Sequence, residues 1–166
     1  MAPKSIQREF VQLIAQHQKL LHSLCSLYFP LLEDRQDLFQ EIVLQFWKSY
    51  PAFNHQAKVS TWMYRVAINT VFRRLRTEKN RPPNAAFSEA TLQIADVSDE
   101  REEAARDLYR AIAQLPDLDK ALIMLYLEEH SYEEMAHILG LSRTNVSTKI
   151  SRIKTRLGKL LKQELQ

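Results

Sequence analysis

The stretch that decides the fold is SYEEMAHILGLSRTNVSTKISR, residues 131–152. Ser131 can cap a helix whose first turn carries two glutamates, where the helix dipole favours carboxylates. The apolar side of that helix recurs at helical spacing, at Tyr132, Met135, Ala136 and Leu139. Gly140 ends the helix, because a residue without a Cβ readily adopts the left-handed conformation that turns the chain. Ser142 then caps a second helix, so the stretch predicts a helix-turn-helix.

The second helix of this motif has one apolar side and one side suited to DNA. The residues expected to pack inward are Val146, Ile150, Ile153 and Leu157. The residues left for a partner are Arg143, Thr144, Asn145, Ser147, Thr148, Lys149 and Arg152. Such side chains read base edges and bind phosphates when a recognition helix lies in the major groove.

A helical hairpin with a merely polar outer surface is the simpler interpretation, and the charge of the segment weighs against it. Residues 143–166 contain one acid, Glu164. The basic residues of the same segment are Arg143, Lys149, Arg152, Lys154, Arg156, Lys159 and Lys162. This imbalance suits a polyanion, so DNA binding is favoured over the simple hairpin.

The composition favours an all-α protein and argues against an enzyme. The 166 residues include only two glycines, and no segment has a convincing strand pattern. The single cysteine, Cys25, excludes an intramolecular disulfide, and neither a C-x-x-C nor an H-E-x-x-H metal motif occurs. The scattered histidines are expected at the surface or in interfaces: His17, His22, His55, His130 and His137. We therefore expect no catalytic residue, metal, cofactor or small-molecule substrate.

Charge and hydropathy indicate where the chain acts. The formal net charge is only +3, so the basic residues form local patches and not a uniformly basic surface. The N-terminus has no apolar leader, and no apolar run approaches the roughly 18 residues of a membrane span. The expectation is a soluble cytoplasmic protein without membrane insertion.

Three helices are expected in the first half of the chain. The first covers residues 6–28. Asp34 caps the second, which ends before a proline. Ser60 or Thr61 caps the third, which continues to about Lys79.

The third helix has an apolar side and a side on which aromatic residues alternate with arginines. The apolar side comprises Met63, Val66, Ala67, Thr70, Val71 and Leu75, and the other side comprises Trp62, Arg65, Asn69, Phe72, Arg73 and Arg76. Exposed rings and guanidinium groups suit single-stranded nucleic acid, because bases stack on rings and phosphates pair with arginine. Alternatively, Trp62 and Phe72 are core residues and the arginines only solvate the surface.

The charge around this helix favours the nucleic-acid interpretation. Residues 58–81 contain a single acid, Glu78. Their basic residues are Lys58, Arg65, Arg73, Arg74, Arg76, Lys79 and Arg81. The chain therefore has a second basic patch, far in sequence from the first.

A linker and two further helices complete the pattern. Residues 83–98 begin at the second proline of a Pro-Pro pair and have weak periodicity, as a flexible linker does. One helix is expected at 99–113 and another from Asp117 or Asp119. Their inward residues should be Ala105, Leu108, Tyr109 and Ile112, then Ala121, Leu122, Met124, Leu125 and Leu127. The predicted fold is all-α, with small helical domains at 1–82 and 99–166.

Several strings, in this order and spacing, resemble the extracytoplasmic-function (ECF) sigma factors of bacterial RNA polymerase. They are DLFQEIVLQFW at 37–47, STWMYRVAIN at 60–69, LR at 75–76, LP at 115–116 and SYEEMAxILGLS at 131–142. The resemblance covers nearly the whole chain. It implies a region 2-like domain at 1–82 and a region 4-like domain at 99–166. The implied partners are core RNA polymerase, promoter DNA and an anti-sigma factor.

The resemblance also assigns residues to partners. The helix that docks on core polymerase is matched by Asp37, Gln40, Glu41 and Leu44. Capture of the melted −10 element is matched by Phe53, Asn54, Lys58, Trp62, Arg65, Asn69, Arg73 and Arg76. Reading of the −35 duplex is matched by the residues already named on the second helix of the motif. The chain departs from the family at Arg73, where an Asp is common, and at Asn145, where a Thr is usual, so promoter preference is expected to differ.

Two other classes of protein compete with a sigma factor. A polymerase-independent helix-turn-helix repressor would bind DNA alone and use its N-terminal half for a ligand or for dimerisation, and nothing in the sequence indicates the apolar cavity that a ligand needs. An interaction protein that binds polymerase without opening DNA would not need both basic faces.

Overall fold

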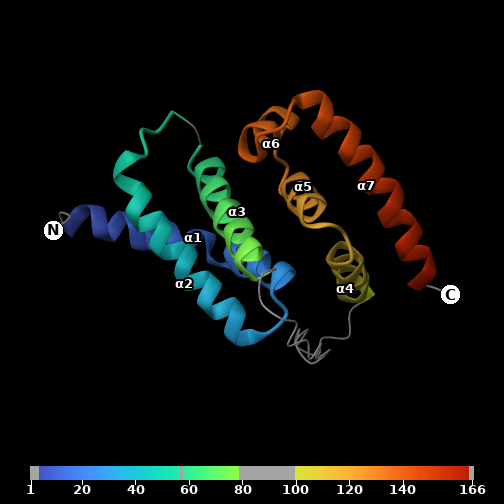
Figure 1. The fold of residues 1–166 in the computed structure, drawn as a ribbon. Helices are drawn as coiled ribbons and strands as arrows, with labels where there is room; N and C mark the ends of the chain where they lie inside the picture. The colour runs from blue at the N-terminus through green and yellow to red at the C-terminus, as the bar shows by residue number, and fades with distance from the viewer. Residues whose placement is uncertain (1–3, 57, 79–99, 165–166) are drawn as a thin grey trace. The chain divides into compact units, whose positions relative to one another are not determined.

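The computed structural model describes residues 4–56, 58–78 and 100–164, and all regular structure within these ranges is helical (Figure 1). The chain divides into two compact units, Met1–Thr91 and Leu92–Gln166. The prediction of an all-α protein with two small helical domains is confirmed. The expected linker at 83–98 lies outside the described residues.

The N-terminal unit is built around its second helix. Its elements are α1 (Lys4–Tyr28), α2 (Leu32–Ser49), the short 3-10 helix η1 (Tyr50–Ala52) and α3 (Val59–Glu78). Helix α2 packs against both α1 and α3. Its side chains Leu38, Ile42 and Phe46 recur at helical spacing and are fully buried between those neighbours. The apolar periodicity of the sequence therefore becomes the core of this unit.

The predicted caps of α2 and α3 are wrong. Helix α2 begins at Leu32, so Asp34 lies inside the first turn, where its charge complements the helix dipole without capping a backbone NH. Helix α3 begins at Val59, and the Trp62 NH donates to the Lys58 carbonyl oxygen at 3.1 Å. Thr61 is buried in the core. A favourable capping residue loses its role when the helix begins before it, as both of these helices do.

The C-terminal unit has a long last helix on which the other helices pack. Its elements are α4 (Glu100–Ala113), α5 (Asp117–Leu127), α6 (Tyr132–Leu139) and α7 (Arg143–Glu164). Helix α7 contacts each of the three others. Five consecutive residues of α5, from Ala121 to Leu125, are buried, so this helix is surrounded on nearly all sides.

Two of the expected inward residues of this unit are exposed. Ala105 is exposed because the buried residues of α4 lie only at its C-terminal end, at Ala111 and Ile112. Leu127 is exposed because α5 ends there and the chain turns away through Glu129, which has a positive φ of 63°.

Candidate DNA and polymerase interfaces

The turn of the helix-turn-helix has the geometry that its sequence predicts. The Ser131 hydroxyl accepts a hydrogen bond from the Glu134 NH at 3.1 Å, and the Ser142 hydroxyl accepts one from the Asn145 NH at 3.1 Å. Gly140 is left-handed, with φ 68° and ψ 33°. The Leu141 NH then donates to the Ala136 carbonyl oxygen at 3.0 Å, which closes the end of α6.

Helix α7 separates its core residues cleanly from its outer residues. Val146, Ile150, Ile153 and Leu157 are buried, as predicted. The predicted −35 residues are all exposed except Lys149, which is half-buried. The exposed residues lie in the first three turns of α7, so they form a continuous polar surface that can reach base edges and phosphates.

An ion pair joins the two helices of the motif at this surface. The Arg143 Nε lies 3.1 Å from the Glu133 Oε1, and both side chains are mostly exposed. From the sequence, Glu133 is expected only to complement the helix dipole in a first turn, and this pairing is not predicted. Nothing in the local pattern signals it, because the turn between the helices brings the two residues together.

Two further side chains of this unit are held in place by neighbours. The His130 Nδ1 lies 2.8 Å from the Glu134 Oε2, and its side chain is only 7% exposed, so this histidine, expected at the surface or in an interface, is not at the open surface. The Lys154 ammonium lies 4.2 Å from the centre of the Tyr126 ring. A hydrogen bond with Tyr126 raises the pKa of Lys154, so this lysine keeps its charge against α5.

The outer face of α3 divides between exposed polar residues and half-buried rings. Arg65, Asn69, Arg73 and Arg76 are exposed. Trp62 is half-buried, with its ring centre 5.0 Å from that of Phe53, 5.5 Å from Phe46 and 6.1 Å from Tyr50. Phe72 is also half-buried and meets Tyr28 at 6.2 Å. Each ring therefore packs in the unit and keeps an accessible part, which combines the two interpretations that the sequence left open.

The loop before α3 carries the remaining residues assigned to the −10 element. Phe53 is half-buried, and its ring lies 4.6 Å from that of His55, which adopts a positive φ of 59°. Asn54 is exposed, and its side-chain oxygen accepts a hydrogen bond from the Gln56 NH at 3.3 Å. Lys58 is exposed at the end of the loop. These side chains lie beside Trp62 and the start of the basic face of α3.

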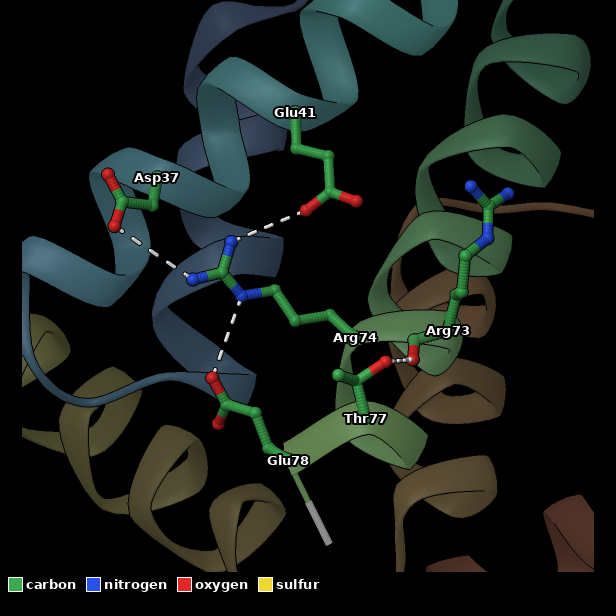
Figure 2. A network of polar contacts seen from close by, with 6 residues as sticks. All are labelled: Asp37, Glu41, Arg73, Arg74, Thr77 and Glu78. Atoms are coloured by element: carbon green, nitrogen blue, oxygen red, sulfur yellow. Dashed lines mark hydrogen bonds and ion pairs between the residues drawn. The ribbon is translucent and has the colours of Figure 1, made fainter. Parts of the chain in front are cut away.

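An arginine from α3 lies against the acidic face of α2. Gln40 is exposed, Leu44 is 48% exposed, and Asp37 and Glu41 both form ion pairs with Arg74 (Figure 2). Arg74, counted in the second basic patch, therefore points toward α2, whereas its neighbour Arg73 points away. The proposed polymerase face and the proposed −10 face meet at these two adjacent residues.

Within the described residues, no three His, Cys, Asp or Glu side chains are grouped so that they could hold a metal ion. The same residues contain no helix that is both long and apolar enough to cross a membrane.

Comparison with known proteins defines the class of protein. Residues 13–81 match the model of Sigma-70 region 2, and residues 105–157 match that of Sigma-70 region 4. The ECF sigma factor SigM of Mycobacterium tuberculosis is 30% identical over 153 residues, which cover 92% of this chain and 76% of SigM. The ECF sigma-E factor of Escherichia coli is 29% identical over 162 residues, which cover 90% of this chain and 84% of that protein. The chain belongs to the ECF family of RNA polymerase sigma factors.

Two solved structures share the fold. The sigma factor RpoE of Bartonella quintana, solved with the anti-sigma factor NepR, superposes with a TM-score of 0.70 at 19% identity and covers 96% of this chain and 98% of its own. CnrH, solved with the cytosolic domain of CnrY, superposes with a TM-score of 0.68 at 24% identity, and the match covers 95% and 90% of the two chains.

The family settles the choice between the classes of protein considered. The chain is a sigma factor that directs transcription initiation, and it is not an enzyme. The repressor hypothesis is not favoured, because both halves of the chain match sigma regions.

Proposed function

We propose that this sigma factor directs core polymerase to its promoters through three surfaces. The exposed face of α2 contacts polymerase, the loop before α3 and the outer face of α3 hold the melted −10 strand, and the N-terminal half of α7 reads the −35 duplex. The region 2 and region 4 matches at 13–81 and 105–157 support this division. The domain limits of 1–82 and 99–166 are proposed on the same ground.

The observation that carries the proposal is the clean separation of sides on α7. Arg143, Asn145 and Arg152 are exposed, whereas Val146 and Ile150 on the same helix are buried against the unit. Arginine pairs bidentately with guanine and asparagine with adenine, so the exposed side can discriminate base pairs. The buried side fixes the rotation of the helix and therefore which residues meet the groove.

The −10 surface is proposed from exposed charge beside accessible rings. Arg65, Arg73 and Arg76 supply positive charge, Asn69 supplies donors and acceptors, and Trp62 and Phe53 supply partly exposed rings. A melted strand needs both, since its phosphates pair with arginine and its unstacked bases stack on rings. Arg73, which stands where the family commonly has an Asp, would add a phosphate contact.

The remaining partners and the location follow from the relatives. RpoE of Bartonella quintana was solved with the anti-sigma factor NepR, and CnrH was solved with the cytosolic domain of CnrY. We infer that this chain also binds an anti-sigma factor, which holds it inactive. We place the protein in the bacterial cytoplasm, where core polymerase and the promoter are found.

Run-off transcription with purified core polymerase on genomic fragments tests the proposal. The expected result is a set of discrete transcripts that require the full chain, together with permanganate-reactive thymines at −10. Tight DNA binding by the chain alone, with no effect on polymerase, would contradict it.

A further inference from the structure

Arg74 lies at the centre of three carboxylates at the C-terminal end of α3 (Figure 2). Its Nη1 is 3.3 Å from the Glu41 Oε2, its Nε is 3.6 Å from the Glu78 Oε1, and its Nη2 is 3.9 Å from the Asp37 Oδ2. Its guanidinium carbon lies 5.7 Å from the centre of the Phe29 ring. Three different nitrogens of one planar group face three different carboxylates, which the single ammonium of a lysine could not do.

The three carboxylates are not held equally. The Glu41 and Glu78 side chains are 33% and 32% exposed, whereas Asp37 is 66% exposed and has the longest contact with Arg74. The contact to Glu41 is also a hydrogen bond. Glu41 is therefore held in the α2–α3 contact, and Asp37 remains open to a partner.

The charge balance keeps this surface acidic. One guanidinium faces three carboxylates, and the exposed Arg73 lines the same hollow as Glu41 and Glu78, which leaves one formal negative charge around Arg74. The Arg74 side chain is the most enclosed of the four, at 20% exposure, and Asp37 is the most exposed, so a partner would meet Asp37 first. Such a surface attracts basic side chains, and its attraction weakens as salt rises.

We propose that Arg74 is an internal counter-ion that withdraws Glu41 from the polymerase-facing surface of α2 and leaves Asp37 as the carboxylate that meets basic groups of core polymerase. Arg74 is thus a positioning residue and not a DNA contact, although it lies in a run of basic residues. The inference rests on the proposed docking of α2 on polymerase. Of the two α2 carboxylates that match the polymerase-docking residues of the family, Asp37 is then a direct contact and Glu41 is held inside the unit.

A comparison of single and double variants of the full chain tests this division. Affinity for core polymerase is measured by biolayer interferometry at low and at moderate salt, and folding is checked by thermal melting. Asp37→Asn should weaken binding by roughly 2- to 10-fold and reduce its salt dependence, as expected for a charge at the rim of an interface. Glu41→Gln should weaken binding less than Asp37→Asn does and lower the melting temperature.

Removal of Arg74 should release Glu41 to the partner. Arg74→Met alone should tighten binding at low salt, because the surface gains a free carboxylate. In the Arg74→Met background, Glu41→Gln should then weaken binding by roughly 2- to 10-fold, as Asp37→Asn does. Lys19→Met is the matched control: it removes the same charge from an exposed position on α1, and in that background the effect of Glu41→Gln should stay as small as in the otherwise unchanged chain.

Several outcomes would overturn the inference. Equal losses for Asp37→Asn and Glu41→Gln in the otherwise unchanged chain would mean that Glu41 is a direct contact, and this comparison holds even if Arg74→Met fails to fold. Weaker binding by a folded Arg74→Met protein would mean that Arg74 itself supports docking. Leu44→Ala separates the two proposals. If neither Leu44→Ala nor Asp37→Asn changes the affinity for core polymerase, the proposed docking face is wrong. If only Asp37→Asn leaves this affinity unchanged, the Arg74 inference alone fails.

Discussion

The two units of this sigma factor bury different kinds of side chain. The buried residues described in the C-terminal unit are all aliphatic or methionine, such as Ile112, Leu125 and Met135. The N-terminal unit also buries aromatic rings, a thiol and two threonines, including Phe46, Cys25 and Thr70. The Thr70 hydroxyl is satisfied by donating to the Val66 carbonyl oxygen at 2.8 Å.

The difference extends to the helices that face DNA. On α7 the core residues and the outer residues are separate sets, so an outer residue can change without loss of packing. On α3 the Trp62 ring belongs to both sets, since it packs on Phe46 and stays partly exposed. Duplex reading needs a stable polar surface, whereas strand capture needs accessible rings that only packing can hold in place.

Alkaline pH should affect the N-terminal unit more than the C-terminal unit. Burial raises the pKa of the Cys25 thiol from 9.0 to about 12, and the positive charge of Arg35 opposes this effect. Between these pH values the unfolded chain loses the thiol proton and the folded unit keeps it. Stability that is present below pH 9 is therefore lost as pH rises, by at most about 1.4 kcal/mol per pH unit.

Urea unfolding between pH 8 and pH 11 checks this expectation. Both tryptophans, Trp47 and Trp62, lie in the N-terminal unit, so their fluorescence reports that unit alone, while circular dichroism reports both units. In Cys25→Ala the alkaline loss seen by fluorescence should be smaller. An identical loss in Cys25→Ala would show that the thiol is not its source.

Trp62→Ala should reduce both stability and promoter opening. The ring contacts three other aromatic rings, so its removal should lower the free energy of unfolding by about 2–4 kcal/mol. Permanganate-reactive thymines at −10 should decrease as well, because a stacking surface is lost.

Asn69→Ala, at an exposed position of the same helix, is the matched control for Trp62→Ala. It should reduce promoter opening and leave the melting temperature unchanged. If Trp62→Ala lowered stability but a folded sample opened promoters normally, Trp62 would be a packing residue only.

Substitutions on α7 should change DNA binding without changing stability. Arg143→Ala or Asn145→Ala should cost about 1–3 kcal/mol at particular −35 base pairs and leave other sequences unaffected. Lys159→Ala, on an exposed position near the end of the same helix, should weaken binding on all sequences and flatten its salt dependence. Binding to a panel of −35 variants at two salt concentrations measures both effects. Equal losses on every sequence for all three proteins would remove the case for base reading by α7.

Glu133→Gln should have the smallest effect. Its ion pair with Arg143 is exposed, so its loss should change the free energy of unfolding by less than about 1 kcal/mol. Because a negative charge beside the proposed DNA surface is removed, binding should tighten slightly on all sequences. Thermal melting and binding to the same −35 panel check this, and a drop of several degrees in the melting temperature would show that the pair has a structural role.

Much of this protein follows from local sequence alone. Ser131, Gly140 and Ser142 determine the turn of the helix-turn-helix, because capping and left-handed geometry depend only on nearby residues. The buried side of α7 follows from a single helical period, since Val146 and Ile150 are one turn apart. The order of motifs along the chain was sufficient to identify the family.

Only the tertiary structure decided the roles of residues whose partners are distant in sequence. Arg74 looked like one more basic residue, but the packing of α3 on α2 places it 3.3 Å from Glu41, thirty-three positions earlier. The role of Trp62 could be decided only when the aromatic rings around it were known. Its ring packs on those of Phe46 and Phe53 and stays partly exposed. The start of α3 has a related cause: Thr61 is buried in the core of the unit, and burial outweighs a capping preference worth about 1 kcal/mol.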